Sequence, residues 1–266
     1  MPTVHHVPTT LERIAHRGAS GAAPENTLAA VELALRQHAT AVEVDVHRTY
    51  DGELVVVHDP TLERTTDVRR VLADRAPWRV ADATLEQIRR LDAGAWFDAR
   101  FAGERVPTLR EVLELVGDRA GVLVEVKRPD HYPGIAADVV AVLRDAGGRT
   151  PVAVQSFDPA FGRALHDAAP GVPVGMLFRR PPAPEELPAL RGWASQVNVS
   201  RHVADAALVD EVHALGMTTR VYTPNTPELM RWYAGLGVDG IITDHPGLLR
   251  DTLAVHPPEA ASPRVA

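Results

Sequence analysis

Short apolar runs rich in β-branched residues alternate along the chain with Ala- and Leu-rich stretches of helical spacing. The apolar runs predict strands at 13–16, 41–47, 54–58, 122–126, 152–156, 173–178, 196–199, 218–222 and 240–243. The helical spacing predicts helices at 27–37, 109–116, 135–145, 159–168, 205–214 and 226–235. Strands that alternate with helices indicate βαβ units and a parallel sheet.

The number of these units favours a closed α/β barrel. If 54–58 continues the second strand or pairs with it across the Asp51-Gly52 turn, the 266 residues hold eight β/α units. That is the usual size of a (β/α)8 TIM barrel. A doubly wound open sheet is the alternative, but its usual G-x-G-x-x-G turn is missing after the first strand.

Two parts of the chain interrupt the repeat or flank it. Residues 59–106 are charged, contain one short helix candidate at 84–91, and are predicted to be an insertion, a small subdomain or lid, after the second β unit. We expect the barrel to span 13–252. The flanking tails are 1–12 and 253–266, and the proline- and alanine-rich second tail is predicted to be disordered.

Composition narrows the class of protein. The net charge of −7 argues against non-specific binding of nucleic acid. The absence of cysteine excludes disulfides, thiolate metal sites and cysteine nucleophiles. The N-terminus shows no signal-peptide pattern and no apolar run could span a bilayer, so we expect a cytoplasmic protein without stable membrane insertion. The oligomeric state is not indicated.

Acidic side chains share one face of two successive predicted strands. In "AVEVDVHRT", alternation puts Glu43, Asp45 and His47 on one face, and in "VLVEVKRP" it puts Glu125 beside Lys127. A salt-bridged cluster would be the structural explanation. Carboxylates inside a barrel also suit a hard divalent cation, which binds oxygen ligands. For His47 we expect either a structural role or support of the acids.

Two histidines stand where strands end. His58 closes the run 54–58, and His16 closes the first strand next to Arg17. Strand ends supply the active-site residues of barrels. Histidine moves protons near neutral pH, and the arginine fork suits a phosphate. Together with the acids and the lysine, these residues indicate metal-assisted cleavage of a phosphate ester. Serine hydrolysis is not supported, because no G-x-S-x-G occurs.

The same motifs carry a resemblance to a known family. The stretches "AHRGASGAAPENT", "EVDVHRTYDGELVVVHDPTLERTT", "LVEVK" and "VDGIITDHP" resemble those of the glycerophosphodiester phosphodiesterases, over about residues 13–249. The resemblance implies a TIM barrel, one divalent cation (Ca²⁺ or Mg²⁺) and a small phosphodiester as substrate. The roles it implies are general acid and base for His16 and His58, metal ligands for Glu43, Asp45 and Glu125, phosphate contacts for Arg17 and Lys127, and a place near the site for Gln155.

One departure concerns the pocket for the alcohol. Where the family often has tryptophan in a W-T-x-N run, this chain reads "VYTPN", with Tyr222. We expect its ring to pack on glycerol and its hydroxyl to bind an alcohol oxygen. We also expect the insertion at 59–106 to overhang the phosphate and touch the leaving alcohol. On these grounds deacylated diesters, such as glycerophosphocholine, are expected to be preferred.

Three functions follow from these residues. The leading hypothesis is metal-dependent hydrolysis of glycerophosphodiesters to glycerol phosphate and an alcohol. The second is phospholipase D-like cleavage of lysophospholipids on the same fold, and the third is a non-catalytic barrel that binds polyol phosphates. The sequence does not indicate which histidine is the acid, or whether water or a glycerol hydroxyl attacks.

Overall fold

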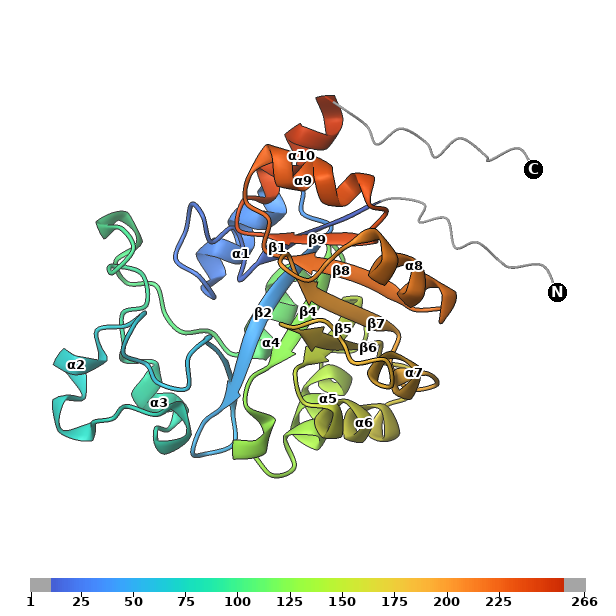
Figure 1. Ribbon diagram of the computed structural model, residues 1–266. Coiled ribbons are helices and arrows are strands. Elements are labelled where there is room, and N and C mark those ends of the chain that lie inside the picture. The colour runs from blue at the N-terminus through green and yellow to red at the C-terminus, as the bar shows by residue number, and fades with distance from the viewer. Residues whose placement is uncertain (1–10, 256–266) are drawn as a thin grey trace, which may run out of the picture.

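The computed structural model describes residues 11–255, which form one sheet closed into a barrel (Figure 1). Eight strands are parallel, and the pairing of β9 with β1 and of β1 with β2 closes the ring. The ninth strand, β3, lies antiparallel to β2. The strands are β1 (Glu12–His16), β2 (Ala41–Arg48), β3 (Leu54–Val56), β4 (Gly121–Val126), β5 (Val152–Ser156), β6 (Val174–Phe178), β7 (Gln196–Ser200), β8 (Thr218–Tyr222) and β9 (Gly240–Thr243).

Helices surround the barrel and confirm the predicted TIM fold (Figure 1). All six predicted helices are present within two residues of their expected ends. The short helices α2 and α7 and the last helix, α10, were not predicted. The helices are α1 (Leu28–Arg36), α2 (Val68–Val71), α3 (Leu85–Ile88), α4 (Leu109–Val116), α5 (Ile135–Asp145), α6 (Pro159–Ala168), α7 (Glu186–Leu190), α8 (Ala206–Ala214), α9 (Pro227–Gly235) and α10 (Pro246–Val255).

The strands alternate between a helix-facing side and a barrel-facing side. On β2, Val42, Val44 and Val46 are fully buried in the core between the sheet and the helices. The interior of the barrel holds a separate small apolar cluster that includes Ile14, Leu123 and Ile242. Period-two alternation therefore turns Glu43 and Asp45 of β2 toward the barrel axis.

The insertion forms a small unit beside the barrel, seen in Figure 1 as α2 and α3 beyond the end of β2. Its own core includes Leu62, Val68, Ile88 and Leu91, against which Trp78 packs. The predicted tails lie mostly outside the described residues, although β1 begins at Glu12 and α10 extends to Val255. Within the described residues, no helix is both long enough and apolar enough to cross a membrane.

Candidate active site

The strand register brings the predicted acidic residues together. Asp45 on β2 lies directly beside Glu125 on β4, and His16 on β1 lies beside Glu43 on β2. Glu125 in turn is level with Gln155 on β5. Because the carboxyl ends of all parallel strands meet at one rim, these side chains form a single cluster there.

The three carboxylates form a tight, buried group. Ligand oxygens of Glu43, Asp45 and Glu125 lie within 4.8 Å of one another. Burial and the charge of Asp45 raise the pKa of Glu43 well above its ordinary value, and the same two causes raise the pKa of Glu125. Within the described residues, Glu43 Oε1 and Asp45 Oδ1 accept no hydrogen bond. Such a group is costly unless positive charge accompanies it.

Two basic side chains supply part of that charge. Lys127 Nζ lies 2.6 Å from Glu125 Oε1 and 3.3 Å from Asp45 Oδ1, and Arg17 Nε lies 3.1 Å from Asp45 Oδ2. Burial alone would raise the pKa of Asp45, but Lys127 and then Arg17 hold it far below its ordinary value. Two cations against three carboxylates leave one negative charge if all are ionised.

The backbone at Arg17 is shaped for this contact. Arg17 has a φ of 56° and Gly18 a φ of 80°. A Cβ at Gly18 would lie 2.6 Å from the carbonyl carbon of Ala30, so only glycine fits. The turn lets the Arg17 N–H donate to Glu43 Oε2 at 2.9 Å. Left-handed backbone at a non-glycine residue is typical of functional sites.

His16 is fixed by a carboxylate that comes from the far end of the sequence. Its Nδ1 lies 2.6 Å from Asp244 Oδ1, after β9. Asp244 also accepts hydrogen bonds from Ser20 Oγ at 3.0 Å and Asn225 Nδ2 at 2.5 Å. Burial would raise the pKa of Asp244, but these donors, led by His16, lower it to about 2. The arrangement leaves His16 Nε2 available to the pocket.

His58 has a similar partner in the next residue. Its Nδ1 lies 2.6 Å from Asp59 Oδ1, and Asp59 Oδ2 accepts from Arg64 Nε at 2.6 Å. Burial is the largest cause that lowers the pKa of His58. In both histidines a carboxylate therefore holds Nδ1, and Nε2 remains for a ligand.

His47 has a structural role beneath this site. It is fully buried, with Nδ1 2.9 Å from the Tyr132 hydroxyl and Nε2 3.2 Å from the carbonyl oxygen of His58. Burial lowers the pKa of His47 to about 4, so it is neutral near pH 7. It supports the backbone of His58. Within the described residues no hydrogen bond joins it to the acids, although the charge of Asp45 acts on its pKa against the effect of burial.

The pocket at the barrel rim has a volume of about 220 Å³. It is lined by eight of the nine predicted site residues, while Asp45, which is 1% exposed, lies beneath. Among the described residues that line it, none comes from 59–106. The expected contact of the insertion with the leaving alcohol therefore finds no support in this lining, and an overhang of the site stays a prediction. Arg64 instead contacts Glu25, at 2.8 Å from each carboxylate oxygen, and steadies the rim.

The Tyr222 hydroxyl already has partners within the protein. The ring lines the pocket, but the hydroxyl donates to the Phe178 carbonyl oxygen at 2.9 Å and contacts Arg179. Its one donor hydrogen is used within the protein, so it does not donate to an alcohol oxygen in this arrangement. Gln155 is likewise held, since its Oε1 accepts from Asn198 Nδ2 at 2.7 Å.

Sequence reasoning missed several supporting side chains. Asn26 donates to Asp45 Oδ2 at 2.8 Å, and Asp244 and Asp59 orient the histidines. All three stand inside the quoted motifs, which was the available signal. Pairing His16 with a residue 228 positions away requires knowing that β9 closes the barrel on β1.

The cluster fits a divalent cation. Its donors are all carboxylate oxygens, a set typical of Ca²⁺ or Mg²⁺ rather than zinc. Two of these oxygens are buried without hydrogen bonds. With all three carboxylates ionised, the cluster would also carry one negative charge that a cation could offset.

Comparisons with known proteins agree with this geometry. Residues 16–248 match the Glycerophosphoryl diester phosphodiesterase family. A glycerophosphodiester phosphodiesterase of Caldanaerobacter subterraneus is 37% identical over 238 residues, covering 89% of this chain and 95% of that protein. Another, from Bacillus subtilis, is 31% identical, covering 91% of this chain and 86% of that protein.

Solved structures show the same fold. An Oleispira antarctica phosphodiesterase, in complex with the product sn-glycerol-3-phosphate, superposes with a TM-score of 0.82 at 28% identity, covering 91% of this chain and 96% of that one. A glycerophosphodiester phosphodiesterase of Agrobacterium tumefaciens gives a TM-score of 0.77 at 33% identity, covering 91% and 100%.

Proposed function

The chain belongs to the glycerophosphoryl diester phosphodiesterase family, and on this premise we propose that it hydrolyses glycerophosphodiesters to glycerol phosphate and an alcohol. One observation carries the proposal. Two histidines, each with Nδ1 on a carboxylate, line one small pocket together with the acid cluster, Arg17 and Lys127. That set matches the needs of phosphodiester cleavage: charge neutralisation and two proton transfers.

Glu43, Asp45 and Glu125 would hold one divalent cation, Ca²⁺ or Mg²⁺. When bound there, it supplies positive charge against the charge that builds on the phosphate oxygens. Arg17 and Lys127 lie in contact with the same carboxylates and line the pocket. They orient the phosphate by hydrogen bonds, the guanidinium as a planar fork and the ammonium as a point charge.

The histidines divide the proton transfers. The lowered pKa of His58 favours its neutral form near pH 7. His58 Nε2 therefore accepts the proton of the attacking hydroxyl, whether that belongs to water or to the glycerol. His16, held by Asp244, donates a proton from Nε2 to the oxygen of the leaving alcohol. Asp244 and Asp59 act as positioning residues that fix each ring.

The alternative of a non-catalytic barrel that binds polyol phosphates has less support. Binding alone would not require two histidines with matched carboxylate partners in the same pocket.

A panel of phosphodiesters tests the proposed function. The protein should release glycerol phosphate from a deacylated diester such as glycerophosphocholine, lose activity in EDTA, and regain it with Ca²⁺ or Mg²⁺ added separately. Tight binding of glycerol phosphate without turnover of any diester would favour the non-catalytic alternative instead.

The pKa of His58 predicts how kcat/KM depends on pH. We expect kcat/KM to fall on the acid side with a midpoint below 6.5, the ordinary histidine value. Burial lowers the pKa of His58, so the neutral imidazole persists to lower pH than in free histidine. It is lost, and activity with it, as the pH falls through the lowered pKa. The charged groups that act on it are Asp45, Arg17, Lys127 and Asp59. An acid limb centred above pH 7 would contradict this assignment of the base.

Two variants of Tyr222 distinguish the packing of its ring from the hydrogen bond of its hydroxyl. Tyr222→Phe keeps the ring but leaves the Phe178 carbonyl oxygen without its donor, so we expect a loss of about 1–3 kcal/mol in the free energy of unfolding and little change in KM. Tyr222→Ala also removes the pocket wall and should mainly raise KM. Urea unfolding and steady-state kinetics on both variants measure this. A large rise in KM for Tyr222→Phe would restore a direct contact between hydroxyl and substrate.

A further inference from the structure

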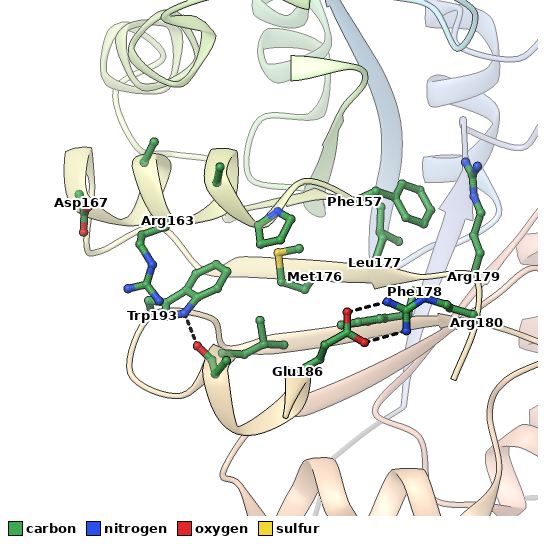
Figure 2. Close-up of a pocket in the computed structure, with 15 residues that line it drawn as sticks. Phe157, Arg163, Asp167, Met176, Leu177, Phe178, Arg179, Arg180, Glu186 and Trp193 are labelled. Carbon is green, nitrogen blue, oxygen red and sulfur yellow. Dashed lines mark hydrogen bonds and ion pairs between the residues drawn. The ribbon is translucent and has the colours of Figure 1, made fainter. Parts of the chain in front are cut away.

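One cationic side chain of the catalytic pocket has no part in the proposed mechanism. Arg179 directly follows β6 and lines the pocket. It also borders an apolar groove of about 800 Å³ between α6 and α7 (Figure 2). The cation site, the phosphate contacts and the two proton transfers leave its guanidinium without a role.

Arg179 differs from the other cationic side chains of the pocket in its partners. The other four are His16, Arg17, His58 and Lys127, and each lies 2.6–3.0 Å from at least one carboxylate oxygen. Among the described residues that line the pocket, Arg179 is the only one of these cations that forms no ion pair with a carboxylate. A guanidinium that faces a pocket without an internal counter-charge can bind an external anion.

The next residue shows the contrast. Arg180 forms two hydrogen bonds of 2.7 Å with Glu186, shown as dashed lines in Figure 2. The same figure shows the side chain of Arg179 running away from that pair and toward Phe157. Arg180 is not among the described residues that line the catalytic pocket. Two successive arginines therefore have different surroundings, and Arg179 is the one that can meet a ligand in the pocket.

Aromatic side chains hold Arg179 at the rim. Its guanidinium carbon lies 4.2 Å from the centre of the Phe157 ring, which packs edge-on against Tyr222 with 6.5 Å between the ring centres. The Tyr222 hydroxyl also contacts the guanidinium. Stacking uses the face of the guanidinium, so most of its in-plane N–H donors remain for a ligand. A side chain that is already ordered loses less conformational entropy on binding.

The place of Arg179 on the barrel separates it from the expected phosphate. In the ring of eight parallel strands, β6 lies four strands from β1 in either direction, and so directly across the barrel from it. His16 and Arg17 stand at the end of β1, and the acid cluster lies on the neighbouring β2 and on β4. Arg179 is therefore placed to contact a substituent of the phosphate rather than the phosphate itself.

We propose that Arg179 recognises a second anionic group on the substrate, so that the preferred diesters have a leaving alcohol that carries a carboxylate. This inference rests on the proposed function and names the class of head group within it. Glycerol carries no charge, so a second anionic group on a glycerophosphodiester belongs to the other alcohol. A carboxylate can accept two parallel N–H bonds from one guanidinium, whereas the trimethylammonium group of choline offers no acceptor. The pocket of about 220 Å³ suits a phosphate with small polar substituents.

Two substrates that differ by one carboxylate provide the test. Glycerophosphoserine is glycerophosphoethanolamine with a carboxylate added to the carbon that bears the ammonium group. We expect kcat/KM for glycerophosphoserine to be roughly tenfold higher, the effect of one charge-assisted hydrogen bond to an exposed guanidinium. Equal values, or a preference for glycerophosphoethanolamine, would overturn the proposal.

Substitution of the arginine shows whether the preference comes from Arg179. Arg179→Gln should reduce the ratio of the two kcat/KM values to near unity. Arg179→Met, whose side chain can still pack on Phe157, is a second neutral variant and should give the same ratio. Arg180→Gln loses the pair with Glu186 outside the pocket and should keep the ratio of the original chain. A ratio that persists in both neutral variants of Arg179 would overturn the proposal and point to the cation site as the group that binds the carboxylate.

Two further outcomes are distinguishable. If Arg179→Gln lowers kcat/KM by the same factor for both diesters, Arg179 acts on the phosphate and the proposal for the head group is wrong. If the original chain hydrolyses no diester, the proposed function fails, and calorimetric binding of the same two diesters decides. Tighter binding of glycerophosphoserine that is lost in Arg179→Gln would support the role of Arg179, whereas equal binding would overturn it.

Discussion

His16→Ala and His58→Ala are each expected to lower kcat by roughly 10²–10⁴-fold, the usual contribution of a general acid or base. Each histidine offers one ring nitrogen to the pocket while a carboxylate holds the other, so alanine removes the proton transfer and leaves the pocket open. Both side chains are only partly buried, at 20% and 28% exposure, so folding should change little. Steady-state kinetics and a thermal melt measure the two effects.

His213 provides the matched control. It also forms a histidine–aspartate pair, with Nε2 2.9 Å from Asp239 Oδ2, but it lies on α8 and does not line the pocket. His213→Ala should therefore reduce stability without a comparable loss of kcat. Near-normal turnover in His16→Ala or His58→Ala would remove that residue from the mechanism.

The barrel was predictable because most of its βαβ units carry a local signal. Valine-rich runs such as 41–47 indicate strands, and amphipathic runs such as 135–145 indicate helices. The number of these units predicts an eight-stranded barrel. The helix α7 was missed because five residues after a proline-rich stretch give no periodic signal. Its shortness leaves an apolar groove of about 800 Å³ between α6 and α7, which no local pattern in the sequence indicates.

The site was predictable as far as side chains share a strand or end one. Glu43 and Asp45 follow from alternation on a single strand, and His16 and His58 from strand ends. Partners brought together by barrel closure, such as Asp244, carry no such local signal. Tyr222 shows a second limit, because the strand position placed its ring correctly while only the three-dimensional structure shows where its hydroxyl is bound.

Chelation is expected to lower kcat/KM roughly 10³-fold or more, because a bound cation contributes several kcal/mol to the stabilisation of transition-state charge. Activity should return on addition of Ca²⁺ or Mg²⁺, and the ion that restores it identifies the cofactor. Full activity in excess EDTA, after dialysis against the chelator, would refute the metal-dependent mechanism and leave Arg17 and Lys127 as the cations that act on the phosphate.

Glu43→Gln separates the cation's effect on stability from its effect on catalysis. Without cation, burial and the charge of Asp45 disfavour ionised Glu43, so a neutral glutamine should leave the free energy of unfolding unchanged or higher. Its amide oxygen can still accept from the Arg17 N–H. The original chain should gain about 2.7 kcal/mol at a free cation concentration one hundred times Kd. That gain should shrink in Glu43→Gln. It should persist in Glu12→Gln, which loses an ion pair with Arg220 at the other end of the barrel. Glu43 belongs to the acid cluster and Glu12 does not. A gain of equal size in all three proteins would therefore show that the cation binds elsewhere.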